Sequence, residues 1–90
     1  MRFEWGNDKN EFLKKQRNVC FEDVVKVLSS DGDINIVPHF NKNYPHQEII
    51  VLKLNNYIHY VPFIEEDGVF FLKTIIPSRR LNKIYNTGII

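Results

Sequence analysis

The sequence predicts a single α+β domain over residues 1–90, with two N-terminal helices packed on an antiparallel sheet of about four strands and a short C-terminal helix. Three observations lead to this prediction. Apolar residues recur with a helical period between residues 18 and 30. Apolar runs separated by turn sequences follow between residues 34 and 76. A chain of 90 residues that is 43% hydrophobic can bury one modest core and is too apolar to be disordered.

The N-terminal part of the chain predicts one short strand and a helix with little apolar surface. Residues 3–5, "FEW", alternate apolar and polar side chains, and we expect them to form the strand. We expect a helix at about residues 8–17, because Asp8 followed by Glu11 resembles a capping box. The apolar face of this helix consists mainly of Phe12 and Leu13. The helix is therefore expected to lie on the surface.

The next segment, "NVCFEDVVKVLSS" at residues 18–30, predicts the second helix. One helical face carries apolar residues at the spacing i, i+3, i+4 and i+7, namely Phe21, Val24, Val25 and Leu28. Glu22 and Asp23 fall in the first turn, where the helix dipole favours acidic side chains. The sequence Ser-Ser-Asp-Gly then ends the helix.

Four strands are expected in the second half of the chain. They cover residues 34–40, 47–54, 57–64 and 69–76. Pro38 places the first of them near a sheet edge, because proline cannot donate to a strand ladder. Asn55-Asn56 is expected to form a two-residue hairpin turn, since asparagine tolerates positive φ. The sequence "EEDG" at 65–68 is expected to form the next turn.

The two hairpins predict which side chains share a face of the sheet. The pairs nearest the turns are expected to be Leu54 with Tyr57 and Ile64 with Val69. Tyr60 then lies opposite Lys73. The face expected to pack in the core carries Ile50, Leu52, Leu54, His59, Val61, Phe63, Phe70, Leu72 and Ile76. The other face, which we expect to be open to a partner protein or an RNA strand, carries Ile49, Val51, Lys53, Tyr60, Phe71, Lys73 and Ile75.

Positive charge is concentrated at the C-terminal end. Residues 68–90 contain four basic and no acidic residues, whereas residues 31–67 contain two basic and six acidic residues. The whole chain has 12 basic and 11 acidic residues, for a net charge of +1. Pro77 is expected to stop the last strand, and Ser78 to be the N-cap of a basic helix over 78–85. An acid-free basic end suits an anionic partner.

Several classes of protein are excluded or disfavoured. The single cysteine, Cys20, rules out an internal disulfide, and no Cys/His set has the spacing of a zinc site. The N-terminal sequence lacks the apolar region of a signal peptide. The longest apolar stretches are too short to span a bilayer. We therefore expect a cytoplasmic protein without a metal or cofactor.

Three strings of the sequence resemble BrnT-like toxins of bacterial type II toxin–antitoxin pairs, within the RelE/ParE-like group. They are "FEWGNDKN" at 3–10, "VCFEDVVKVL" at 19–28 and "IIPSRR" at 75–80. The middle of the chain, 31–56, matches only in its strand pattern. The resemblance implies a RelE-like fold, an mRNA-cleaving ribonuclease that inhibits growth, and neutralisation by a cognate antitoxin of ribbon-helix-helix type encoded beside it.

The chain departs from the pattern of this family at two places near the helices. The family commonly has Lys-His-Gly between its two helices, whereas this chain has "KQRN", so that Arg17 stands where the histidine is expected. Cys20 replaces the serine that usually caps the second helix. The missing histidine affects the expected active site more than the expected fold.

RNA can be cut without a metal, and the sequence contains candidate groups for this chemistry. The 2′-hydroxyl attacks the adjacent phosphate, which requires a proton acceptor, a cation and a donor for the leaving oxygen. Arg79 matches the family's arginine after the last strand and is the first candidate for the phosphate. Lys73, Tyr60 and His59 are candidate helpers, with no assignment of the general base. The alternatives are a snorkelling lysine and, for His59, a half-buried core histidine beside Leu52.

Further residues are candidates for binding RNA. On the first helix they are Lys9, Lys14, Lys15 and Arg17, and on the last helix Arg80, Lys83 and Tyr85. A solvated helix face is the alternative for the basic residues, and packing on the core is the alternative for Tyr85. His39 and His46 flank a loop, but the sequence links neither of them to a partner.

Two other functions remain open at this level. A catalytically inactive relative could keep the antitoxin-binding or RNA-binding surface, which the missing histidine favours. A stand-alone RNA-binding module is the third hypothesis. A cleavage assay separates the first two hypotheses, and a neighbouring antitoxin reading frame would favour both of them over the third.

Overall fold

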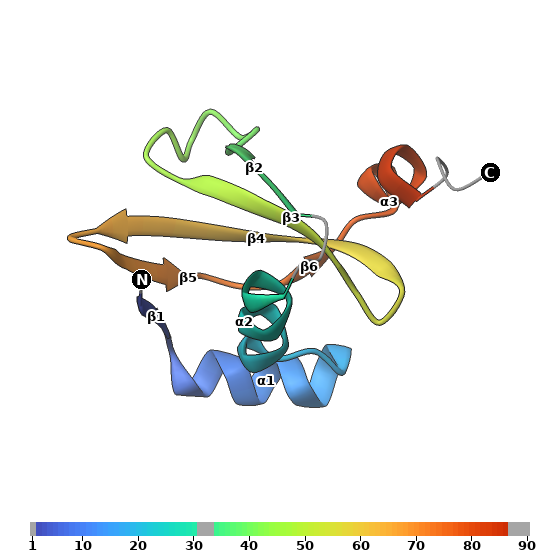
Figure 1. Cartoon of the computed structure of the whole chain (residues 1–90), viewed down its shortest axis with the longest axis horizontal. Helices are drawn as coiled ribbons and strands as arrows, with labels where there is room; N and C mark the ends of the chain where they lie inside the picture. Colours follow the sequence, from blue (N-terminus) through green and yellow to red (C-terminus); the bar gives the residue numbers. More distant parts are fainter. Residues whose placement is uncertain (1, 31–33, 87–90) are drawn as a thin grey trace.

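The structure is a computed structural model that describes residues 2–30 and 34–86. Within these ranges it contains three helices and six strands (Figure 1). In chain order they are β1 (Arg2–Trp5), α1 (Asn7–Arg17), α2 (Phe21–Ser29), β2 (Ile34–Pro38), β3 (Glu48–Leu54), β4 (Tyr57–Glu66), β5 (Val69–Leu72), β6 (Ile76–Pro77) and α3 (Arg79–Asn86). The α+β class is confirmed. None of the described helices is long and apolar enough to cross a membrane.

The strands form one mostly antiparallel sheet. Its order is β1-β5-β4-β3-β2, and β6 pairs with β4 beyond the end of β5. The pairing of β1 with β5 is parallel. The prediction of an antiparallel sheet of about four strands is therefore wrong in strand number and in the direction of one strand. Hairpin turns identify only neighbours along the chain, and β1 reaches β5 from the opposite end of the sequence.

The first predicted hairpin is confirmed, and the second is shifted by two residues. Asn55 and Asn56 both have positive φ, and Leu54 pairs with Tyr57 as expected. The second turn consists of Asp67 and Gly68 alone, so that Glu66 rather than Ile64 is opposite Val69. A shift of two residues preserves the faces of the sheet, because side chains alternate with a period of two.

A bulge between β5 and β6 changes the face on which the last residues lie. From the pair Phe63–Leu72 to the pair Tyr60–Ile76, β4 advances three residues while the other strand advances four. One extra residue turns the following side chains to the opposite face. Ile75 is consequently buried in the core with no exposed surface, and Ile76 is turned to the other side. The predicted faces of Ile75 and Ile76 are wrong, as is the predicted pairing of Tyr60 with Lys73.

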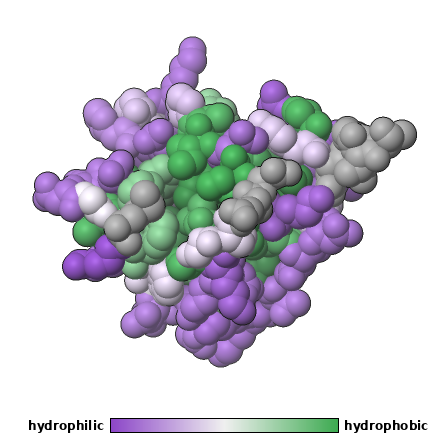
Figure 2. Space-filling view, viewed as in Figure 1, coloured by the Kyte–Doolittle hydropathy of each residue, from purple (hydrophilic) through white to green (hydrophobic). Residues whose placement is uncertain are grey.

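The main core lies between the sheet and the two N-terminal helices, on what we call the α1/α2 face. Its fully or nearly buried apolar residues are Leu13, Val19, Phe21, Val24, Ile50, Leu52, Leu54, Val61, Phe63, Leu72 and Ile75. Trp5 of β1 stacks on Phe21 with ring centroids 5.5 Å apart. Figure 2 shows hydrophobic side chains gathered in the middle of the molecule, whereas α1, at the bottom, presents a hydrophilic surface.

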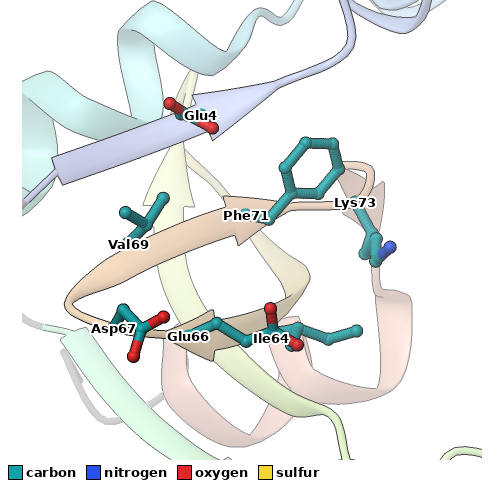
Figure 3. A pocket seen from close by; sticks show the side chains of 7 residues that line it. All are labelled: Glu4, Ile64, Glu66, Asp67, Val69, Phe71 and Lys73. Carbon is teal, nitrogen blue, oxygen red and sulfur yellow. The ribbon is translucent and has the colours of Figure 1, made fainter.

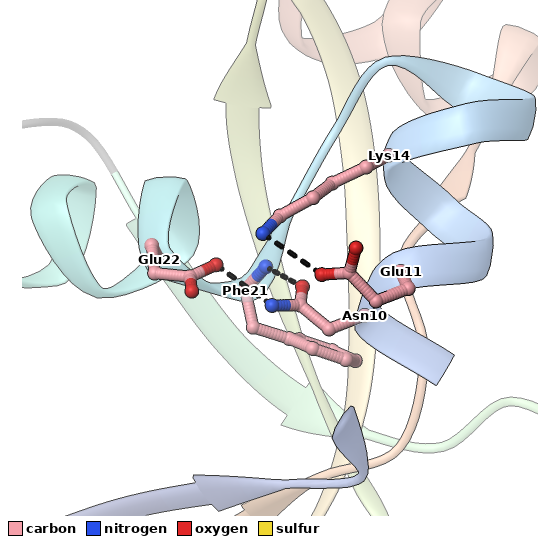
Figure 4. Close-up of polar contacts among 5 residues, drawn as sticks. All are labelled: Asn10, Glu11, Lys14, Phe21 and Glu22. Carbon is pink, nitrogen blue, oxygen red and sulfur yellow. Dashed lines mark hydrogen bonds and ion pairs between the residues drawn. The ribbon is translucent and has the colours of Figure 1, made fainter. Parts of the chain in front are cut away.

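A buried asparagine joins α1 to α2. The Asn10 side chain is 3% exposed, and its Oδ1 accepts a hydrogen bond from the Phe21 backbone N–H at 2.8 Å. Its Nδ2 donates to Oε1 of Glu22 at 2.8 Å (Figure 4). This bond lowers the pKa of Glu22. Asn10 thus satisfies an amide at the start of α2 that has no partner within the helix.

The expected start of α1 is wrong in its capping residue. Gly6 is the N-cap, so no side chain caps the start of α1 with a hydrogen bond. Asp8 lies within the first turn. Asp8 there still interacts favourably with the helix dipole. The helix ends at Arg17, and its C-cap Asn18 takes the left-handed conformation with φ of 55°. Leu13 is fully buried and Phe12 is 49% exposed, so α1 lies on the surface with one anchoring apolar side chain beside the buried Asn10.

The third helix packs on the opposite side of the sheet, which we call the α3 face (Figure 1). The Ser78 hydroxyl accepts a hydrogen bond from the Leu81 backbone N–H at 3.1 Å, which confirms Ser78 as the N-cap of α3. Asn82 of α3 accepts a hydrogen bond from the Ile58 backbone N–H at 3.0 Å. A small cluster of Ile49, Val51 and Ile58 is buried there with Tyr60 and Leu81 packed against it. The expectation that Ile49 and Val51 lie on an open surface is therefore wrong.

Candidate functional site

The α3 helix presents the predicted basic residues to solvent. Arg79 and Arg80 are its first two residues, and both are exposed, as are Lys83 and Tyr85. Positive side chains are unfavourable at a helix N-terminus, where the dipole is also positive. These arginines therefore do not contribute to helix stability through the dipole. α3 carries no acidic residue, so the charge of its first turn is not neutralised within the helix.

Lys73 lies on the same side of the sheet, directly after β5. Its backbone N–H donates to the Pro62 carbonyl at 2.8 Å, and its ammonium is 4.9 Å from the centroid of the Phe71 ring. Its side chain is exposed and borders a pocket of about 300 Å³. We call this the His39–Lys73 pocket; it is lined by His39, Tyr44, Gln47, Pro62, Lys73, Thr74 and Ile76. Among the described residues, its lining contains several hydrogen-bond donors and no acid.

The loop between β2 and β3 forms the other wall of this pocket. Its backbone is ordered by hydrogen bonds from His39 N to Gln47 O and from Tyr44 N to Asn41 O. The His39 ring lies 5.0 Å from the Tyr44 ring and 5.1 Å from the Phe40 ring, measured between centroids. Nδ1 of His39 accepts a hydrogen bond from the Asn41 backbone N–H at 3.0 Å. Aromatic packing and backbone bonds therefore hold His39 in place beside Lys73.

A shallow groove continues from this pocket toward α3. The groove measures about 210 Å³ and is lined by Val37, Pro38, Phe40, Ile49, Val51, Ser78, Arg80, Leu81, Ile84 and Tyr85. Phe40 connects the two hollows, because its ring packs beside His39 and lies 5.2 Å from the Tyr60 ring. Like the pocket, the groove has no acidic lining residue within 2–30 and 34–86.

Exposed aromatic rings and cations both line these two hollows. Phe40 is 63% exposed, Tyr44 46% and Tyr85 43%. We call the group formed by Lys73, Tyr44, Phe40, Arg80 and Tyr85 the aromatic–basic track. Burial of large aromatic side chains is favourable, so rings left exposed beside cations indicate a surface that binds something flat and anionic.

A larger pocket on the other side of Lys73 has the opposite charge. It measures about 440 Å³ and is lined by Glu4, Ile64, Glu66, Asp67, Val69, Phe71 and Lys73. Lys73 lies at one end of this pocket and Asp67 at the other (Figure 3). Three carboxylates disfavour a phosphate there, so an anion approaching Lys73 is favoured on the His39 side. No group of three or more His, Cys, Asp or Glu residues among the described residues could hold a metal ion.

His59 does not lie with the other candidate catalytic residues. It alternates with Tyr60 along β4 and faces the α1/α2 core, where it is 6% exposed. Its Nδ1 is 2.9 Å from the Tyr57 carbonyl. Burial lowers the pKa of His59, and the nearby positive charge of Arg17 lowers it further. His59 is therefore a core histidine, as in the alternative that the predicted register offered, and it is more fully buried than the half-buried side chain expected there.

Tyr60 faces the α3 side and is half-buried between Phe40 and the small apolar cluster. Burial raises its pKa, while the charge of Arg17 opposes this change. The phenol therefore stays protonated at neutral pH. In this state Tyr60 can donate a hydrogen bond but cannot act as a base.

The basic residues of α1 are separated from the track by the sheet. Lys14 forms an ion pair with Glu11 at 3.1 Å, which raises the pKa of Lys14, and the Lys9 ammonium lies 5.4 Å from the Phe12 ring centroid. Lys15 is exposed on the same helix. Together with Arg17, these residues are on the α1/α2 side of the molecule (Figure 1).

Arg17 has a structural contact that the sequence did not predict. Its Nη1 donates to the Ile75 carbonyl at 2.7 Å, which ties the end of α1 to the bulge between β5 and β6. The bulge follows Lys73 directly. Arg17 therefore contributes to the placement of the segment that carries Lys73 on the other side of the sheet.

Comparison of the chain with protein-family models, with curated proteins and with solved structures finds no match. The family resemblance consequently depends on the three strings of the sequence, and the functional argument depends on the residues of the α3 face.

Proposed function

We propose that this chain is the toxin of a type II toxin–antitoxin pair, a metal-independent endoribonuclease that cuts mRNA in the cytoplasm and is neutralised by a cognate antitoxin of ribbon-helix-helix type. The observation that carries the proposal is the aromatic–basic track, in which exposed rings and cations line two hollows that contain no acid from the part of the chain that the structure describes. Single-stranded RNA binds such surfaces by stacking its bases on the rings and placing its phosphates beside the cations.

The residues of the α3 face suit charge stabilisation better than proton abstraction. In the proposed reaction the RNA 2′-hydroxyl gives its proton to solvent water and attacks the adjacent phosphorus, the bond to the 5′-oxygen breaks, and solvent water returns a proton to that oxygen. A 2′,3′-cyclic phosphate and a protonated 5′-hydroxyl result. Arg79 and Lys73 would neutralise the charge that develops on the phosphate oxygens, and protonated Tyr60 would donate a hydrogen bond to one of them. Arg80, Lys83 and Tyr85 would hold the flanking nucleotides.

A second candidate function is binding of RNA or antitoxin without cleavage. The burial of His59 on the α1/α2 face favours it, because the candidate base is removed from the track. The residues of α1, including Arg17, face away from the track and do not replace that base. In this case the same track would bind its partner with no change in the RNA.

Expression in bacteria tests the toxin proposal. We expect growth arrest when the wild-type chain is produced alone, relief by Arg79→Ala, and relief by co-expression of the reading frame beside it. Lys15→Ala is the matched control, because it removes one exposed cation from the opposite side of the molecule. Normal growth with abundant, folded wild-type protein would contradict the proposal.

Purified protein separates the two candidate functions. The nuclease should convert single-stranded RNA to fragments with 2′,3′-cyclic phosphate ends in the presence of a chelator, and Arg79→Ala should slow this reaction at least tenfold. RNA binding without fragments would favour the binding function. The absence of both binding and cleavage would count against both.

A further inference from the structure

The His39–Lys73 pocket combines one cation with several neutral donors. Lys73 is its cationic lining residue, and its other polar lining residues, whose side chains carry ring, hydroxyl and amide groups, are His39, Tyr44, Gln47 and Thr74. The three carboxylates near Lys73 line the neighbouring pocket instead. A site of this composition fits a single phosphate group, whose oxygens accept several hydrogen bonds and whose charge is matched by the lysine.

The protonation state of His39 follows from a hydrogen bond. The Asn41 backbone N–H can only donate, so Nδ1 of His39 must accept and cannot carry a proton. The neutral ring then carries its proton on Nε2. Protonation of Nδ1 would break the bond to Asn41, which helps to order the loop. Nε2 is thus the ring nitrogen of His39 that can donate to a ligand.

We propose that the His39–Lys73 pocket is a phosphate-binding subsite for a backbone phosphate of single-stranded RNA, in which neutral His39 donates through Nε2 and Lys73 supplies the charge. This inference rests on the proposed RNA-binding function and adds a residue that the sequence left without a role. The bound phosphate neighbours the nucleotide that stacks on Phe40, because Phe40 packs directly against His39. His39 is a binding residue here and not the general base.

Two substitutions of His39 separate its two ring nitrogens. His39→Asn places an amide oxygen near the position of Nδ1, so it keeps an acceptor for Asn41 N–H and loses the donor at Nε2. His39→Gln places an amide nitrogen near the position of Nε2, so it keeps the donor to the ligand. The first variant therefore tests the ligand contact with the loop preserved, and the second tests rescue by another neutral donor.

The proposal is tested by measuring, through fluorescence, the affinity of the protein for a 2′-O-methyl oligoribonucleotide with hydroxyl ends. This probe cannot be cleaved. We expect His39→Asn to weaken binding about tenfold, as for loss of a hydrogen bond to a charged group, and His39→Gln to stay within about threefold of wild type. We also expect imidazole nitrogen spectra of the free protein to show the proton on Nε2. Unchanged binding by His39→Asn, or a proton on Nδ1, would overturn the proposal.

Two further measurements distinguish failure of this site from failure of the proposed function. If natural RNA is not cleaved but the His39 variants change oligonucleotide binding as expected, the nuclease function is contradicted and the phosphate site is supported. Cleavage of RNA with equal binding by wild type and His39→Asn would support the nuclease function and overturn the phosphate site. Inorganic phosphate at about pH 8 serves as the second probe. Protection of the His39 signals by inorganic phosphate, with no binding of the oligonucleotide, would overturn the assignment to RNA.

Discussion

The two faces of the sheet differ in how much of their apolar surface is covered. On the α1/α2 face, eleven apolar residues form one buried cluster, and most have almost no exposed surface. On the α3 face the buried cluster has three members, and large side chains such as Phe40, Ile84 and Tyr85 remain exposed around it. The stability of the domain therefore comes mainly from the first face. This leaves the second face free to keep exposed rings and cations that a core would not tolerate.

The largest expected effect is loss of stability from a change on the α1/α2 face. Phe21→Ala removes a fully buried ring that stacks on Trp5, and we expect it to lower the free energy of unfolding by about 3–5 kcal/mol. Phe40→Ala is the matched control on the α3 face, where 63% of the ring is exposed, and should change it by less than about 0.5 kcal/mol. Urea denaturation measures both. Similar losses in the two variants would show that the faces share the core equally.

A smaller loss of stability is expected when the hydrogen bonds of Asn10 between α1 and α2 are removed. Asn10→Ala leaves the Phe21 amide without its partner and removes the bond to Glu22, so we expect a loss of about 2 kcal/mol. Gln16→Ala on the same helix is exposed and should be nearly neutral. Equal stability of the two variants would mean that Asn10 does not hold α1 against α2.

The corresponding effect on the α3 face concerns binding rather than stability. Lys73→Ala should leave the free energy of unfolding within about 0.5 kcal/mol of wild type, because the side chain is exposed. It should weaken RNA binding and reduce the slope of log affinity against log salt concentration by about 0.7, the value for one phosphate contact on a single strand. Lys15→Ala should change neither quantity. Loss of salt dependence in Lys15→Ala instead would place the RNA on the α1 side.

The smallest expected effect is a pH dependence of the stability that the Asn10–Glu22 hydrogen bond contributes. The hydrogen bond from Asn10 lowers the pKa of Glu22 in the folded state. The ionised carboxylate therefore stabilises the fold above its ordinary pKa, and this contribution is lost as the pH falls through the lowered folded-state pKa. Between about pH 6 and about pH 3, the urea midpoint of wild type should fall further than that of Glu22→Gln. Parallel curves would contradict the assigned bond.

Local patterns in the sequence predicted the elements well and their long-range placement less well. The apolar spacing of Phe21 and Val24 identified α2 and its buried side, and Asn55-Asn56 identified a hairpin with the correct register. The cap of α3 at Ser78 was likewise visible locally. Each of these depends on residues within a few positions of one another, where backbone geometry is decided by side-chain type.

The errors in the predicted sheet come from features that no local pattern records. The β4–β5 turn used two residues instead of four, and the bulge after Lys73 exchanged the faces of Ile75 and Ile76. Both depend on which register packs best against the helices, which is a property of the assembled sheet. The parallel pairing of β1 with β5 also requires the intervening helices to be in place.

The candidate site shows the same division. The sequence by itself determined that the C-terminal end carries cations without acids, that Ser78 begins a helix there, and that a strand precedes this helix. Only the tertiary structure decided that His39 stands beside Lys73, that His59 faces the core, and that the basic residues of α1 lie on the other side of the sheet. The physical reason is that charge and local propensity belong to individual residues, whereas neighbourhood across a sheet depends on strand order and register, which the packing of the whole chain selects.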